Sequence, residues 1–158
     1  MNTGQINNQL VKAITLFAKN LTSHSDENFK IAQLIEFIDG TIMFDLRNTF
    51  KGKLQNTGIT LYISEFEWLK RKLVNDSINV QLEHNSRLIR VNKTSDELSI
   101  TLRKSNGKLK TLSFKNEEMK NLIEFILIFE EKLKSLAIEK KFSFDFSEIS
   151  YYKESIIN

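Results

Sequence analysis

The chain has 158 residues, 41% of them hydrophobic and 27% charged, with a formal net charge of +3. That length suits one domain or two small repeats sharing a core, and the composition is typical of a soluble globular protein. The absence of cysteine excludes disulfides and thiolate metal sites, and no apolar run is long enough to cross a membrane. We expect an intracellular protein, nuclear in a eukaryote or a nuclear virus and cytoplasmic in a bacterium or phage.

The first forty residues predict a helix and then a strand. Between Asn8 and Thr22 the apolar residues have the i, i+3, i+4, i+7 spacing of an amphipathic helix. A strand is expected over 29–38, although KIAQLIEF could also form one or two helical turns. Asp39-Gly40 is a two-residue hairpin signal that leads into the next strand.

A second strand is expected over 41–50, where polar and apolar residues alternate. Because side chains alternate between the two faces of a strand, Asp45 and Arg47 share one face and the apolar residues take the other. Asp45 is unfavourable for a phosphate on that face. We expect it to orient Arg47 as an ion pair.

A basic loop follows, and a third strand is expected over 59–63. Ser64 and Glu67 have the spacing of a capping box, so a helix is predicted to begin at Glu65. One side of this helix carries the basic run Lys70 to Lys72, which is typical of a solvated helix face but could also follow phosphates.

The second half repeats this plan in pattern. Arg47 matches Arg103 at an offset of 56 residues, and Trp68 matches Met119 at an offset of 51. Four strand-like segments precede a long helix predicted over 116–137; they cover 77–84, 86–93, 96–104 and 109–114. We therefore predict an internal duplication. Its parts are an N-terminal helix (1–27), one sheet-and-helix repeat (28–76), a second repeat (77–138) and a tail or edge strand (139–158).

An ordered series of short motifs runs from Phe29 to Leu73: FKIA, the DG turn, IMFDLRNTF, a GK loop, NTGITL and ISEFEWLKRKL. This series resembles the single-stranded-DNA-binding domain of the positive-cofactor-four family of transcriptional coactivators. That family has an Ile-Arg pair at a strand end, an aromatic residue three positions later, a KGISL-like strand, and a helix with a tryptophan in its first turn. The counterparts here are Leu46-Arg47, Phe50, Gly58 to Leu61, and Trp68. The resemblance covers about 45 residues, and the second half follows it only in pattern.

The resemblance implies a fold and a function. Two domains of that family, each a curved antiparallel sheet backed by a helix, associate through their helices and hold single-stranded nucleic acid on their paired sheets. This chain would then be an α+β protein with tandem antiparallel sheet-and-helix repeats, a Whirly-like pseudo-dimer preceded by an N-terminal helix. Arg47 would contact phosphates or base edges, and Trp68 would pack in the core. Phe50 would stack on bases or, alternatively, tuck under the sheet.

The function expected on this basis is non-enzymatic binding of single-stranded DNA, with weak sequence preference, in transcription, replication or repair. Lysine and arginine gain affinity from phosphates, and aromatic rings stack on unpaired bases. Because the net charge is only mildly basic, that charge has to be segregated onto one face. The predicted nucleic-acid contacts are Arg47, Phe50, Lys51, Lys53, Arg90, Arg103, Lys104, Lys108 and Lys110.

Two alternatives to DNA binding stay open. Asp39, Asp45 and Thr57 stand where the family is basic or near basic, which favours a protein-interaction or structural module that has lost the nucleic-acid site. An RNA-binding member of the same fold is the other alternative. His24 and His84 lack metal-ligand spacing, and no glycine-rich phosphate loop or nucleophile motif occurs, so no catalytic residue, metal or cofactor is predicted.

Two further segments are predicted to meet partners. The long helix over 116–137 has an apolar stripe broader than one small sheet needs, which favours core packing plus a helix–helix contact and so a homo-oligomer. In the tail, Phe142, Phe144 and Phe146 alternate with polar residues. That pattern predicts an edge strand that could be exchanged between subunits, or a detachable acidic-aromatic tail that recruits protein partners or occupies the binding face. No membrane partner is expected.

Overall fold

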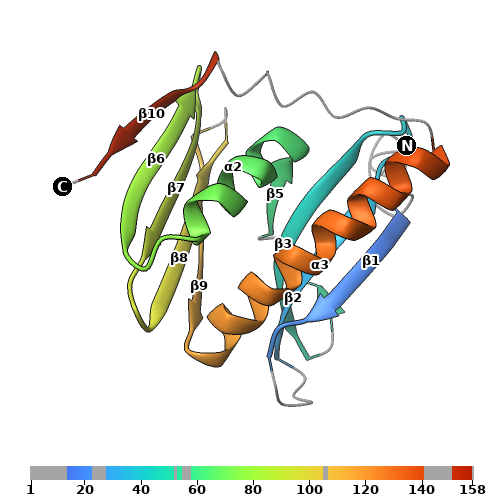
Figure 1. Ribbon diagram of the computed structural model, residues 1–158, viewed down its shortest axis with the longest axis horizontal. Coiled ribbons are helices and arrows are strands. Elements are labelled where there is room, and N and C mark those ends of the chain that lie inside the picture. Colours follow the sequence, from blue (N-terminus) through green and yellow to red (C-terminus); the bar gives the residue numbers. More distant parts are fainter. Residues whose placement is uncertain are drawn as a thin grey trace.

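The computed structural model describes residues 14–22, 28–51, 53–54, 58–104, 107–140 and 151–157. These residues form an α+β protein with two antiparallel five-stranded sheets and two helices (Figure 1). Both helices lie on the same side of the molecule in this view, in front of the sheets. No helix in the described residues combines the length and the apolar character needed to span a membrane.

The first half is an antiparallel meander followed by a helix. Its elements are β1 (Ile14–Asn20), β2 (Lys30–Glu36), β3 (Ile42–Phe50), β4 (Lys53–Leu54), β5 (Ile59–Tyr62) and α2 (Ile63–Leu73). β1, β2, β3 and β5 are neighbours in that order, and the short β4 pairs with the end of β3.

The second half also begins with four paired strands and a helix, and its fifth strand follows the helix. It contains β6 (Ile78–His84), β7 (Arg87–Lys93), β8 (Glu97–Arg103), β9 (Leu109–Lys115), α3 (Glu117–Lys140) and β10 (Lys153–Ile156). β6 to β9 form a meander, and β10 pairs with the other edge of β6. Each half thus has four meandering strands and then a helix, although the duplication itself stays a prediction.

The predicted N-terminal helix is wrong for the part of it that the structure describes. Ile14–Asn20 is the edge strand β1, paired with β2, and residues 8–13 of that prediction lie outside the described residues. A register shift between Thr15 and Phe17 interrupts the alternation. Such a bulge lets the consecutive residues Leu16 and Phe17 both pack against the core. The apolar residues of this strand therefore do not alternate strictly, and their spacing resembles that of an amphipathic helix.

One hydrophobic core runs through both halves. α3 lies on sheet β1–β2–β3–β5, where Phe129 meets Phe44 of β3 (ring centroids 5.0 Å apart) and Phe66 of α2 (4.9 Å). Phe17 of β1 stacks on Phe125 at 5.3 Å. Trp68 is 2% exposed, which confirms its expected place in the core.

The first turn of α2 differs from the prediction. The helix begins at Ile63, and the backbone N–H of Tyr62 donates to Oε1 of Glu65 at 3.0 Å. Glu65 therefore caps the helix in place of the predicted Ser64–Glu67 pair. The buried hydroxyl of Ser64 has no hydrogen-bond partner among the described residues.

The last turn of α2 is fastened to the second sheet by a buried lysine. Nζ of Lys93, at the end of β7, donates to the carbonyl of Leu73 at 2.9 Å and to that of Asn75 at 2.6 Å. Carbonyl groups at a helix end lack partners inside the helix, and a cation there also complements the helix dipole. This contact fixes the helix of the first half against the sheet of the second.

Candidate nucleic-acid interface

The two sheets approach each other where β5 meets β9. β5 lies beside β3, which carries Arg47, and β9 follows the lysine-rich turn after β8. Basic side chains that are far apart in the sequence are therefore brought to one place.

Four of the nine predicted contacts form a group that we call the basic cluster: Arg47, Lys104, Lys108 and Lys110. Burial lowers the pKa of Lys110, and the positive charges of Lys104, Arg47 and Lys108 lower it further. Near the lysines, the N–H of Gly107 donates to the carbonyl of Lys104 at 2.8 Å, and Gly107 has a φ of 85°. A positive φ of this kind favours glycine.

Arg47 is held in this cluster by a buried carboxylate. Its Nε lies 2.8 Å from Oδ2 of Asp45, and its Nη2 lies 3.1 Å from Oδ1. The expected ion pair is thus confirmed. Asp45 is 0% exposed and also accepts hydrogen bonds from Nε2 of Gln33 (2.7 Å) and Oγ1 of Thr60 (2.8 Å). Side chains of β2, β3 and β5 therefore all satisfy one buried charge.

Gly58 gives the arginine room to lie there. In the register of β3 and β5, Gly58 is one step beyond the Leu46–Ile59 pair and so stands opposite Arg47. A Cβ atom on Gly58 would come within 2.6 Å of Cζ of Arg47. The sequence motifs did not indicate this role of Gly58; a glycine placed across from an arginine in a predicted strand pair is the signal that could have found it.

The residues predicted near the end of β3 lie beside its hairpin with β4. Lys51 is exposed at φ 51°, and its backbone N–H donates to Oδ1 of Asn28 at 3.0 Å. Phe50 ends β3 and pairs in register with the exposed Lys53 of β4. Base stacking by Phe50 stays a prediction.

Arg90 and Arg103 lie on a different surface, the outer face of sheet β6–β9. Arg90 is exposed and donates to Oε1 of Gln81 at 3.0 Å, and Arg103 pairs with Glu83 at 3.1 Å. Lys110 instead has the parity of the buried residues of β9, so it points toward the first half. The predicted contacts therefore do not form one continuous face.

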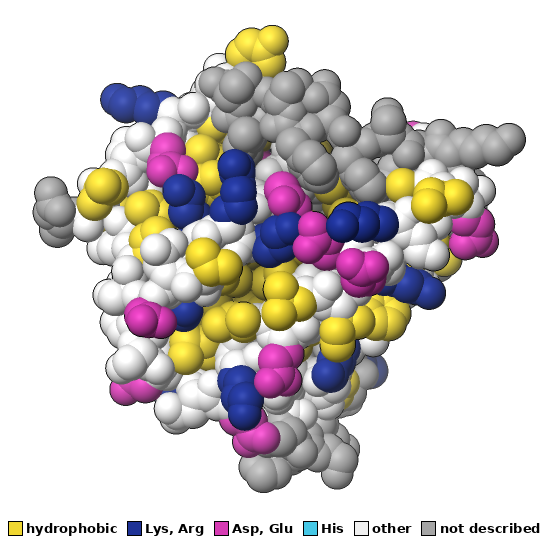
Figure 2. Space-filling view, viewed as in Figure 1, with side chains coloured by type: hydrophobic (Ala, Val, Ile, Leu, Met, Phe, Trp, Pro, Cys, Tyr) yellow, Lys and Arg dark blue, Asp and Glu magenta, His cyan; other side chains and the backbone are white. Residues whose placement is uncertain are grey.

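Two of the three basic residues in the last turn of α2 are held in ion pairs. Lys70 lies 2.7 Å from Glu130 and 2.9 Å from Glu67, and Lys72 lies 2.9 Å from Glu154. Figure 2 shows the side of the molecule that carries both helices. Positive and negative side chains alternate there around a central group of hydrophobic ones, so this side offers no surface of one charge.

Within the described ranges, no group of three or more His, Asp or Glu side chains is placed to hold a metal ion. Comparisons with protein-family models, with curated proteins and with solved structures found no match to this chain. The resemblance to the positive-cofactor-four family therefore rests on the sequence motifs alone.

Proposed function

We propose that the protein binds single-stranded DNA without catalysing a reaction, and that the basic cluster holds the phosphates. The observation that carries the proposal is the convergence of Arg47 from the first half with three lysines from the second. Cations that repel one another in the free protein gain when a polyanion is bound, because binding relieves the repulsion and releases counterions from the nucleic acid.

The position of the cluster also supports a Whirly-like pseudo-dimer. Each half has four meandering strands and a helix, and the cluster lies where the edge strands β5 and β9 meet. A strand of DNA bound there would contact both halves at once. Such a site recognises the backbone, which agrees with the weak sequence preference expected from the sequence.

The test is a titration of labelled single-stranded DNA, single-stranded RNA and duplex DNA at two salt concentrations. Four phosphate contacts predict that the affinity for single-stranded DNA falls roughly 50-fold between about 50 and about 200 mM salt. Tighter binding of RNA than of DNA would favour the RNA-binding alternative. No binding of any of the three at low salt would contradict the proposal.

A protein-interaction module is the second candidate, and one observation favours it. Leu127 and Ile128 of α3 are 58% and 53% exposed, in the middle of a helix that is otherwise well packed. Exposed apolar residues rimmed by charged ones are typical of protein interfaces. This candidate predicts that Leu127→Glu abolishes partner binding or self-association, whereas the DNA-binding proposal predicts unchanged DNA affinity for that variant.

A further inference from the structure

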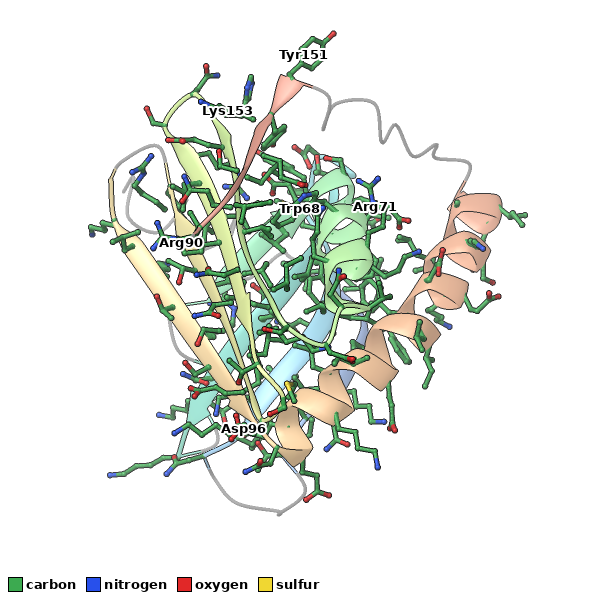
Figure 3. The ribbon with its side chains drawn as sticks, turned by 60° about the vertical axis from the view of Figure 1, so that its left-hand side comes forward. Trp68, Arg71, Arg90, Asp96, Tyr151 and Lys153 are labelled. Carbon is green, nitrogen blue, oxygen red and sulfur yellow. The ribbon has the colours of Figure 1, made fainter. Side chains whose placement is uncertain are left out.

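Among the side chains that the structure describes, two large aromatic ones are exposed: Tyr62, at 45%, and Tyr151, at 75%. Figure 3 shows Tyr151 pointing away from the body of the molecule, ahead of β10. Tyr62 instead ends β5, the strand of the first sheet that meets β9 of the second. An exposed ring therefore lies on the strand that borders the basic cluster.

Tyr62 also shares a face of the first sheet with the arginine of that cluster. In the register of β3 and β5, Thr60 pairs with Asp45, and Tyr62 is two residues further along β5. Because side chains of one parity share a face, Tyr62 stands on the face that carries Asp45 and Arg47. Gly58, opposite Arg47, is four residues before Tyr62, which corresponds to about 13 Å along a strand. One short segment of single-stranded DNA can therefore contact both the ring and the cluster.

A fixed guanidinium lies against the ring of Tyr62. Cζ of Arg87, at the start of β7, is 4.9 Å from the centroid of that ring. Nε of Arg87 donates to Oε2 of Glu65 and Nη2 donates to Oε1, both at 2.7 Å, and Glu65 is 0% exposed. A guanidinium that is bidentate to a carboxylate keeps its flat face available for stacking on an aromatic ring. Arg87 thus orients Tyr62 in the free protein.

The same arginine connects the ring to the basic cluster. Nη2 of Arg87 donates to the carbonyl of Thr60 at 3.0 Å, and the hydroxyl of Thr60 donates to Oδ1 of Asp45 at 2.8 Å. Asp45 in turn holds Arg47. A continuous series of contacts therefore runs from Tyr62 to Arg47 through side chains of β7, β5 and β3. Groups that are already held in place lose less conformational freedom when they bind a ligand.

We propose that Tyr62 is a base-stacking platform, on which an unpaired base lies while the basic cluster holds the neighbouring phosphates. This inference rests on the proposed binding of single-stranded DNA and adds a second kind of contact at the same site. Phosphate contacts recognise only the backbone, whereas an aromatic ring recognises the flat face that every base possesses. Stacking on Tyr62 therefore favours single strands over duplex DNA, whose bases already stack on one another, without a strong sequence preference.

Two oligomers of equal length test this inference: oligothymidylate, and an abasic deoxyribose-phosphate chain that has the same charges but no bases. The full-length wild type and Tyr62→Leu would be titrated with each oligomer at low salt, with far-ultraviolet circular dichroism to confirm the fold. Leucine keeps apolar bulk but removes the ring. We expect Tyr62→Leu to bind oligothymidylate roughly 5- to 150-fold more weakly than the wild type, the effect of losing one base stack. Its affinity for the abasic chain should be unchanged.

Two control variants accompany Tyr62→Leu. Tyr62→Phe keeps the ring and should bind both oligomers as the wild type does. Tyr151→Leu removes the other exposed ring, which points away from the body, and should also leave both affinities unchanged. A loss of oligothymidylate affinity in Tyr151→Leu as large as that in Tyr62→Leu would refute a specific role of Tyr62.

The wild type provides a test that needs no variant. It should bind oligothymidylate at least about 5-fold more tightly than the abasic chain. Equal affinities of the wild type for the two oligomers would refute stacking and leave the proposed DNA binding in place, as would a folded Tyr62→Leu that loses both affinities equally or neither. A wild type that binds neither oligomer would overturn the proposed function, and the stacking inference with it.

Discussion

Asp45 is the residue on which the local order of the candidate site depends. It faces away from the core side of β3, yet it is fully buried, and its carboxylate is satisfied by Gln33, Arg47 and Thr60. A buried charge is tolerated only when it is paired and hydrogen-bonded. Part of the charge of Arg47 is therefore committed to the protein, and the lysines of the basic cluster contribute a larger share of the affinity for phosphate.

Removal of the arginine should destabilise the fold strongly. Arg47→Ala leaves Asp45 buried without its cation, which we expect to lower the free energy of unfolding by about 3 kcal/mol. Arg103→Ala is the matched control, because Arg103 ends the corresponding strand β8 but pairs with a Glu83 side chain that is 38% exposed. Arg103→Ala should lower the free energy of unfolding by less than about 1 kcal/mol. If urea unfolding shows equal losses of this free energy for the two variants, Asp45 does not need Arg47 as its partner.

Replacement of Gly58 should act through Arg47. Gly58 does not have a positive φ, so alanine fits the backbone, but its Cβ would displace the arginine side chain. We expect Gly58→Ala to lower stability by about 1–3 kcal/mol, and to have little further effect in an Arg47→Ala background. A double-mutant cycle in urea measures this coupling. Strictly additive effects would mean that the two residues are independent.

The lowered pKa of Lys110 predicts how stability changes with pH. The folded state releases this proton at a lower pH than the unfolded state, whose lysine titrates near 10.5. The unfolded state therefore binds more protons in the interval between the two pKa values, and stability should rise with pH across that interval. Unfolding in urea between pH 7 and pH 10 should show a smaller rise for Lys110→Gln than for the wild type. A variant with an unchanged pH profile would contradict the coupling of Lys110 to its neighbours.

At the scale of elements, α3 holds the first sheet and the second half together. Its inner side contributes Phe125 and Phe129 to a cluster with Phe17, Phe44 and Phe66. The sequence predicted α3 and most strands well, because long apolar repeats and turn signals such as Asp39-Gly40 report local structure directly. β1 was predicted incorrectly because a bulge disturbs its alternation, and only pairing with β2 determines that it is a strand.

Truncation of Phe129 should weaken both halves together. Phe129→Ala removes a fully buried ring that contacts β3 and α2, and we expect the free energy of unfolding to fall by about 3–5 kcal/mol. Leu127→Ala on the exposed side of the same helix should change it by less than about 0.5 kcal/mol. Trp68 fluorescence and far-ultraviolet circular dichroism should still report one transition. Two separate transitions would contradict a core shared by the halves.

At the scale of the whole molecule, the candidate site forms where the two halves of the chain contact each other. Sequence motifs singled out Arg47 and the three lysines separately, but only the contact between β5 and β9 brings them together. Arg90 and Arg103 are also arginines on strands, as Arg47 is, but they lie on the outer face of the second sheet. The sequence could not indicate that this face is separate from the basic cluster, because the separation depends on how the two sheets meet.

The central claim is that the basic cluster, rather than the net charge, binds single-stranded DNA. Two triple variants test it: Lys104, Lys108 and Lys110 changed to Gln, and the exposed Lys19, Lys115 and Lys120 changed to Gln. Each removes three positive charges and brings the formal net charge from +3 to zero.

The measurement is the salt dependence of single-stranded DNA affinity for both variants and the wild type. The cluster variant should bind more weakly at low salt, and its slope of log affinity against log salt should be shallower by roughly 2, which corresponds to three lost phosphate contacts. The control variant should keep an affinity and a slope close to those of the wild type. Equal losses in the two variants, or a cluster variant that binds as the wild type does, would contradict the claim.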